Sequence, residues 1–308
     1  MQAAASVRVE HPIESVRARA YEIPTDEPEE SDGTLTWTST TMVLVEVRAA
    51  NHTGIGYTYG DAGIATIVER TLNDALRDCD ALQTAARYAD MVAKIRNNGR
   101  EGMTAMAVSA VDVALWDLKG KVLGAPVSAL LGAARRAAPL YGSGGFTSYS
   151  ERRLTEQLAC WVHEMRIPRV KMKVGRDAAA DPHRVAAARK AIGSDAELFV
   201  DANGAYTAKQ ALEMARAHFA DRRVTWFEEP VYHNDLEGNR FVRDHAPPVM
   251  EISNGEYGYA PYDFARIISS GAADVLQADV TRCGGYSGFL AVDALCEANN
   301  VPLSSHCA

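Results

Sequence analysis

The chain has 308 residues, 47% hydrophobic and 23% charged, which is the composition of an ordinary globular protein long enough for two domains or one large one. Its net charge of -8 argues against nucleic acid or an acidic membrane as a partner. Five scattered cysteines without CxxC spacing, no signal-peptide run and no membrane-spanning stretch predict a cytoplasmic protein with neither a disulfide framework nor a zinc site.

The first part of the chain predicts an antiparallel sheet followed by helices. After a loose start over residues 1–10, strands are expected at 13–23, 41–48 and 54–60, and helices at 64–76 and 101–122. Runs of strands followed by helices favour an α+β domain, which we assign to residues 1–138. The acidic segment from Pro24 to Thr41 is too polar for a core, so we expect a mobile loop there.

From Pro139 onward the pattern changes to strands alternating with helices. Strands are expected at 139–142, 169–175, 197–201, 224–228, 248–252, 273–279 and 301–306, with a helix capped by Ser150 after the first of them. This succession predicts a parallel sheet, most simply a TIM-type α/β barrel over residues 139–308. A doubly wound open sheet is the second choice, because no Gly-rich fingerprint follows the first strand.

The strand from Arg169 to Gly175 contains two lysines, Lys171 and Lys173, in alternation with apolar residues. Side chains two apart on a strand share a face, so both ammonium groups project together. A buried pair of like charges needs anionic groups opposite, whereas solvated lysines on an edge strand would need none.

Six polar residues lie at or just past the ends of successive predicted strands. They are Lys173, Asp201, Glu228, Glu256, Asp279 and His306. Any one of them could be a helix cap or a core hydrogen-bonding group, but in a barrel the carboxyl ends of all strands meet at one mouth. Three carboxylates there, Asp201, Glu228 and Glu256, suit Mg²⁺. The fourth, Asp279, could pair with His306 and fix the tautomer of its imidazole. The set suits removal of a proton next to a carboxylate to give an enediolate.

These motifs resemble the enolase superfamily, and within it the mandelate racemase group. The resemblance rests on the Lys171–Lys173 pair, on the helix over residues 107–120 and on five further motifs. These are Val200-Asp-Ala-Asn203, Phe227-Glu-Glu-Pro230, Asn254-Gly-Glu256, Ala278-Asp-Val-Thr-Arg-Cys-Gly-Gly285 and Ser304-Ser-His306. Aspartate at 279 followed by His306 separates the chain from the muconate-cycloisomerase and dipeptide-epimerase branch, which has a lysine at the former position. In that superfamily a Lys or His base acts with Mg²⁺.

The resemblance implies a role for each matching residue. Lys173 would be the base on one face of the substrate, Lys171 would neutralise the substrate carboxylate, and His306, oriented by Asp279, would be the second base or the acid. The implied metal ligands are Asp201, Glu228 and Glu256. Asn203, Glu229 and Tyr57 would surround the substrate, and the N-terminal part would be a capping domain whose loop closes over it.

The expected activity is a magnesium-dependent lyase that dehydrates sugar acids to 2-keto-3-deoxy acids. A racemase or epimerase of a 2-hydroxy acid needs the same two bases and is the alternative, and a catalytically silent homologue with a binding or assembly role is a third possibility. The family also implies a homo-oligomer, a dimer or an octamer. About 170 residues follow Pro139, fewer than the ~200 or more of a complete barrel, so the eighth strand and a C-terminal segment are expected to be missing from this sequence.

Overall fold

The computed structural model describes residues 10–306, so most of the expected loose start and Cys307 lie outside the described residues. The strands of the N-terminal part are β1 (Ser15–Pro24), β2 (Glu30–Ser31), β3 (Thr36–Trp37), β4 (Ser39–Ala49) and β5 (His52–Tyr59). The remaining strands are β6 (Gly142–Gly144), β7 (Arg169–Lys173), β8 (Glu197–Asp201), β9 (Val224–Glu228), β10 (Glu251–Asn254), β11 (Val275–Asp279) and β12 (Leu303–His306).

The helices of the N-terminal part are α1 (Gly63–Thr66), α2 (Asn73–Leu76), α3 (Thr84–Lys94), α4 (Met103–Leu123) and α5 (Val127–Leu130). Those of the second part are α6 (Glu151–Ala159), α7 (Asp181–Ile192), α8 (Ala208–Glu213), α9 (Leu236–His245), α10 (Pro261–Ser270) and α11 (Gly285–Asn299). Three π-helical segments, Ile67–Leu72, Cys160–Glu164 and Met214–Phe219, continue neighbouring helices. None of the helices in the described part of the chain combines the length and apolarity needed to cross a bilayer.

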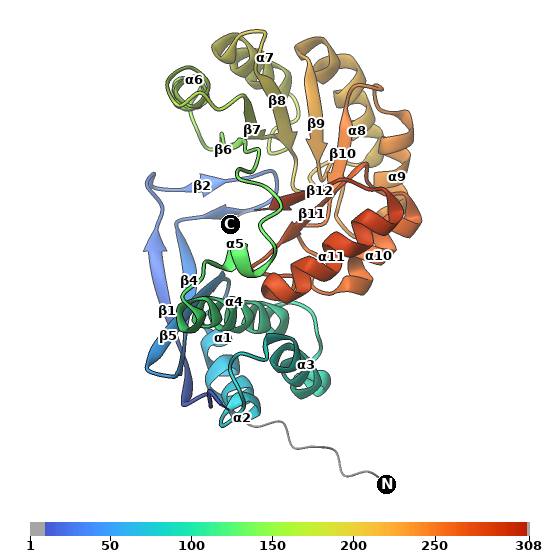
Figure 1. The fold of residues 1–308 in the computed structure, drawn as a ribbon. Helices are drawn as coiled ribbons and strands as arrows, with labels where there is room; N and C mark the ends of the chain where they lie inside the picture. The colour runs from blue at the N-terminus through green and yellow to red at the C-terminus, as the bar shows by residue number, and fades with distance from the viewer. Residues whose placement is uncertain (1–9, 307–308) are drawn as a thin grey trace.

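The N-terminal sheet has the antiparallel order β1-β4-β5, and α4 packs across one of its faces (Figure 1). Strand β5 approaches this helix so closely that a Cβ at Gly54 would lie 2.0 Å from the carbonyl oxygen of Ala114, and one at Gly56 would lie 2.1 Å from that of Ala110. Only glycine therefore fits at these two buried positions, because any side chain would push the strand off the helix.

The second part is a curved parallel sheet of seven strands in the order β6 to β12, with helices α6 to α11 on its outer side (Figure 1). Residues alternate along β7 as predicted: Val170 and Met172 are buried in the core between sheet and helices, and Lys171 is buried on the opposite face. This sheet is an incomplete TIM-type barrel, so the barrel prediction is confirmed and the doubly wound alternative is wrong. The predicted division at residues 138/139 falls between α5 and β6 and stays a prediction.

Several local predictions differ from the structure. Helices α3 and α5 were not predicted. Strand β6 pairs with β7 through Gly142–Gly144 rather than through residues 139–142, because the glycines let Trp161 pack directly on the backbone. Strand β10 begins at Glu251 rather than at Pro248, which lacks the N–H that a sheet requires.

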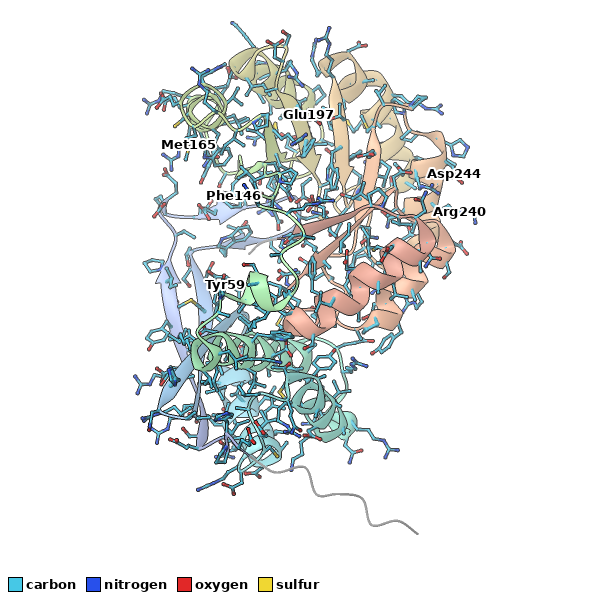
Figure 2. The ribbon with its side chains drawn as sticks, viewed as in Figure 1. Tyr59, Phe146, Met165, Glu197, Arg240 and Asp244 are labelled. Carbon is cyan, nitrogen blue, oxygen red and sulfur yellow. The ribbon has the colours of Figure 1, made fainter. Side chains whose placement is uncertain are left out.

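The acidic segment that we expected to be a mobile loop forms the hairpin β2–β3 and is seated on the loop between β6 and α6. The hydroxyls of Ser31 and Thr147 hydrogen-bond at 2.7 Å, and the Thr147 N–H donates to the Ser31 carbonyl at 2.7 Å. Trp37 packs edge-on against Phe146, which Figure 2 labels close to this junction. A Cβ at Gly33 would lie 2.2 Å from the Ala202 carbonyl oxygen, so the hairpin tip rests on the end of β8. Its mobility stays a prediction.

A buried carboxylate joins the two parts of the chain. Asp112 of α4 accepts hydrogen bonds from the backbone N–H of Ser287 at 2.9 Å and from its hydroxyl at 2.7 Å, at the start of α11. Burial raises the pKa of Asp112 to about 7, although the hydrogen bonds from Ser287 lower it.

We predict that this carboxylate makes stability depend on pH. Between the usual pKa of 3.8 and about 7, the folded protein keeps a proton on Asp112 that the unfolded chain has released. The contribution of this group to stability is therefore full below pH 3.8 and is lost as pH rises to about 7. Between pH 4 and 7, this group should lower the free energy of unfolding of wild type in urea by at most about 4 kcal/mol. Asp112→Asn should not show this decline. Parallel pH profiles for wild type and variant would contradict the assignment.

Candidate active site

The barrel brings the predicted polar residues to one place, the carboxyl ends of its strands. Lys171 and Lys173 lie on β7, Asp201 ends β8, Glu228 ends β9, Glu256 follows β10 by two residues, Asp279 ends β11 and His306 ends β12. The four acidic residues are almost fully buried, and Lys171 is 2% exposed. Buried charges at this density persist only in contact with opposite charges.

The two lysines meet two of the carboxylates. Lys171 Nζ lies 2.6 Å from Glu228 Oε2 and 3.5 Å from Asp201 Oδ2, and Lys173 Nζ lies 2.5 Å from Asp201 Oδ2. Burial lowers the pKa of Lys171, but Glu228 and Asp201 raise it well above its usual value. For Lys173, burial and Lys171 lower the pKa, whereas Asp201 raises it and the balance is upward. Charge on Asp201 is thus the main factor that keeps Lys173 protonated.

On the other side of the mouth, His306 lies between two carboxylates. Its Nδ1 is 2.9 Å from Asp279 Oδ2, and its Nε2 is 3.0 Å from Glu256 Oε2. Asp279 is fixed in turn, because its Oδ1 accepts hydrogen bonds from both the N–H and the hydroxyl of Thr281. Burial lowers the pKa of His306, but Glu256 and Asp279 raise it to about 9.

The carboxylates have the character of a site for a hard cation. The ligand atoms of Glu228, Glu256 and His306 lie within 4.8 Å of one another. Asp201 is not in this closest set, but it shares Lys171 with Glu228. Glu228 Oε2 accepts from Lys171 and from the Trp226 indole at 3.3 Å, whereas Glu228 Oε1 is buried without a hydrogen-bond partner among the described residues. A buried, unpaired carboxylate oxygen favours a cation ligand, and carboxylates suit Mg²⁺ better than imidazole does.

Asn203 and Glu229 border this cluster in strained backbone conformations. Both have positive φ, 46° and 38°, which few non-glycine residues adopt and which occurs often at functional sites. Asn203 Oδ1 and Glu229 Oε1 are buried without hydrogen-bond partners in the described part of the chain. Burial and the neighbouring Glu256, Asp201 and Glu228 raise the pKa of Glu229 well above its usual value.

Tyr57 is not part of the cluster. It lies on β5, its side chain is 42% exposed, and its ring packs edge-on against Tyr59. Burial raises the pKa of Tyr286 and Tyr57 adds to the rise, which indicates that the two phenols lie near each other. Its predicted role in substrate binding stays a prediction.

Two residues of the site were not predicted from the sequence. The Trp226 indole N–H donates a hydrogen bond to Glu228, and Arg282 lies next to Glu256 and Asp279. The alternation along β9 could have indicated that Trp226 and Glu228 share a face. Arg282 stands in a loop, where no periodicity indicates the direction of a side chain.

Comparison with known proteins gives two family matches that together span most of the chain. The family model for the N-terminal domain of mandelate racemase / muconate lactonizing enzyme matches residues 23–132, and the enolase C-terminal domain-like model matches residues 153–308. A curated relative, the 3,6-anhydro-alpha-L-galactonate cycloisomerase of Streptomyces coelicolor, is 36% identical over 96% of this chain and 82% of its own length.

Solved structures are also similar to nearly the whole chain. A mandelate racemase/muconate lactonizing enzyme-like protein from Rubrobacter xylanophilus is 51% identical, with a TM-score of 0.93 over 96% of this chain and 82% of that one. The L-talarate/galactarate dehydratase from Salmonella typhimurium LT2, liganded with Mg and L-lyxarohydroxamate, is 27% identical, with a TM-score of 0.88 over 99% of this chain and 81% of that one.

The charge balance of the cluster predicts a large loss of stability when one lysine is removed. In a buffer with a chelator, Lys171→Met leaves Asp201 and Glu228 buried beside one fewer cation. We expect the free energy of unfolding in urea to fall by about 3–5 kcal/mol.

Lys121→Met is the matched control, because Lys121 pairs with Asp117 at 2.7 Å on the surface, where both side chains are more than a third exposed. This loss should stay below about 1 kcal/mol. Equal losses in the two variants would show that the buried cluster does not depend on Lys171.

Proposed function

Because the chain belongs to the mandelate racemase and muconate lactonizing enzyme family of the enolase superfamily, we propose that it is a magnesium-dependent lyase that dehydrates sugar acids. The observation that supports this most is the arrangement at the mouth of the barrel. Lys173 stands at one side of three buried carboxylates, and His306, paired with Asp279, stands at the other. A substrate carbon between them would have a proton-transferring group on each side.

Asp201, Glu228 and Glu256 are the proposed ligands of the magnesium ion. Glu228 Oε1 fits this role, because it is buried and has no hydrogen-bond partner within residues 10–306. The L-talarate/galactarate dehydratase of the same fold binds Mg together with L-lyxarohydroxamate. When bound, the ion supplies positive charge for the oxygens of a substrate carboxylate.

In the proposed reaction Lys173 acts in its neutral form, which a cation bound at Asp201 would favour by offsetting the charge that raises the pKa of Lys173. Lys173 removes the proton on the carbon next to the substrate carboxylate, and the electron pair moves into that carboxylate to give an enediolate. Lys171, which is buried beside the site, offsets part of the added negative charge. His306 then donates a proton to the β-hydroxyl, which leaves as water. The remaining enol becomes a 2-keto-3-deoxy acid. Asp279 holds the His306 ring through Nδ1, so that Nε2 carries out the transfer.

A second candidate is a cycloisomerase of an anhydro sugar acid, which the 36% identity to the Streptomyces coelicolor enzyme favours. Lys173 and His306 could catalyse this reaction as well. The oxygen that leaves the β-carbon would be the ether oxygen of a ring instead of a hydroxyl. The ring would then open, and the product would be an isomer formed without loss of water. A racemase remains the alternative in which a proton returns to the same carbon from the other side.

Asn203 and Glu229 are proposed to contact the substrate, because each has a buried oxygen at the edge of the cluster with no hydrogen-bond partner in the described part of the chain. The division into a capping domain (1–138) and a barrel domain (139–308) is proposed as well. The homo-oligomer and the cytoplasmic location stay predictions.

Incubation with a panel of acids tests the proposed function. Gluconate, galactonate, glucarate, galactarate and a 3,6-anhydrogalactonate would each be incubated with the enzyme and Mg²⁺, and 2-keto acids would be measured by a colour reaction. We expect keto acid from at least one open-chain acid and a drop of about 100-fold or more when a chelator removes the metal.

Other outcomes of the panel distinguish the alternatives. Keto acid from the anhydro acid alone identifies the cycloisomerase, and loss of optical rotation without keto acid identifies the racemase. If no acid is converted and calorimetry detects no Mg²⁺ binding, the protein is a silent homologue.

Variants of the two proton-transferring residues should separate the steps. Lys173→Met should abolish both keto-acid formation and uptake of deuterium at the α-carbon from D2O. His306→Asn should lower keto-acid formation about 100-fold or more but retain deuterium uptake, because Lys173 still removes the α-proton. NMR of the recovered acid measures the uptake. Retained uptake in Lys173→Met would mean that Lys173 is not the base.

A further inference from the structure

Arg282, in the loop between β11 and α11, completes a ring of alternating charges with three residues of the site. Its Nε lies 3.6 Å from Asp279 Oδ2, and its Nη1 lies 3.7 Å from Glu256 Oε1. Because His306 contacts the same two carboxylates from the other side, the ring is closed. Each carboxylate therefore lies between two positively charged or hydrogen-bonding partners.

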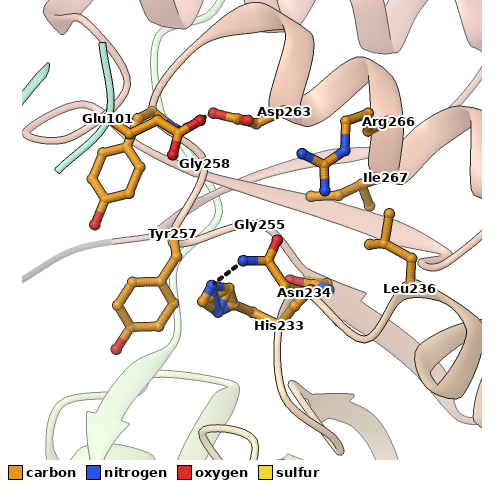
Figure 3. A pocket seen from close by; sticks show the side chains of 12 residues that line it. Glu101, His233, Asn234, Leu236, Gly255, Tyr257, Gly258, Asp263, Arg266 and Ile267 are labelled. Carbon is orange, nitrogen blue, oxygen red and sulfur yellow. Dashed lines mark hydrogen bonds between the residues drawn. The ribbon is translucent and has the colours of Figure 1, made fainter. Parts of the chain in front are cut away.

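The firmest contact of Arg282 ties two loops together. Its Nη1 donates a hydrogen bond to the backbone carbonyl of Glu256 at 3.1 Å, which joins the loop after β10 to the loop after β11. Its guanidinium also lies 4.9 Å from the centre of the Tyr257 ring. Figure 3 shows Tyr257 beside His233, and the centres of these two rings are 4.8 Å apart. Arg282 is thus enclosed, and its side chain is only 15% exposed.

The N-terminal part of the chain holds the loop that carries Arg282. The Thr58 hydroxyl of β5 donates to the Thr281 carbonyl at 2.8 Å, and the Gly284 N–H donates to the Ser109 hydroxyl of α4 at 2.8 Å. These bonds fix the backbone on both sides of Arg282. The direction of its side chain is therefore set by the fold rather than by the carboxylates alone.

We propose that Arg282 is a positioning residue that holds Glu256 and the Asp279–His306 pair at a fixed separation, and this inference rests on the proposed function. Without the guanidinium, Glu256 and Asp279 would have His306 as their shared positive partner, and repulsion between them would turn both side chains. A misplaced imidazole would deliver its proton poorly, and a misplaced Glu256 would bind a metal ion less well. Lys173 belongs to β7 and would keep its place.

The test compares Arg282→Met and Arg282→Lys with wild type in two measurements. Calorimetry with Mg²⁺ alone should show a 10–100-fold weaker affinity for Arg282→Met. At saturating Mg²⁺, with the acid of the panel that wild type converts fastest, kcat for keto acid should fall about 10–100-fold while KM and deuterium uptake change less than about threefold. Arg282→Lys should recover part of the loss, because an ammonium restores the charge but not the two-pronged geometry of the guanidinium.

Arg243→Met is the matched control. Arg243 pairs with Asp274 at 2.6 Å between α9 and the residues before β11, at the end of the strands away from the site. This variant should keep wild-type turnover and Mg²⁺ affinity.

The inference is overturned if Arg282→Met stays within twofold of wild type in both measurements, or if its deuterium uptake and keto-acid formation fall in parallel. If wild type converts no acid of the panel, the proposed function fails. The calorimetric titration with Mg²⁺ then tests the role of Arg282 by itself. Weaker Mg²⁺ binding by Arg282→Met supports the inference, and unchanged binding overturns it.

Discussion

The site depends on the balance between buried positive and negative charges. Lys171 and Lys173 project from one strand into a largely buried region, and this is stable only because Asp201 and Glu228 lie within ion-pair distance. The carboxylates in turn depend on the cations, including His306 and Arg282. Any change of charge at one of these residues must therefore alter the proton affinity or position of the others.

The N-terminal part supports this site through packing and hydrogen bonds from its described residues. Its hairpin β2–β3 rests on the end of β8, where Gly33 leaves room for the carbonyl of Ala202. Its helix α4 holds the start of α11 through Asp112 and Ser109. The barrel loops that carry Arg282 and the residue after Asp201 are thus contacted from outside the barrel, at the edge of a site that contains mutually repelling groups.

The sequence predicted the barrel and the residues at its mouth because both follow from simple regularities. Alternation along β7 places Lys171 and Lys173 on one face, and one βα unit separates each strand-end residue from the next. The hairpin β2–β3 could not be predicted, since its contacts lie on a distant loop around Thr147. Strand β6 contains two glycines, which have a low β-propensity, so its pairing with β7 depends on tertiary contacts that the local sequence does not indicate. The direction of Arg282 depends on loop contacts of the same distant kind.

The most direct test of the account is a crystal structure with Mn²⁺ in place of Mg²⁺, located by anomalous diffraction. We predict one ion at the barrel mouth, bound by oxygens of Asp201, Glu228 and Glu256, with Lys173 and His306 on opposite sides of a bound acid. An ion bound instead by Glu228, Glu256 and His306, the closest set in the present structure, would remove His306 from proton transfer and contradict the account.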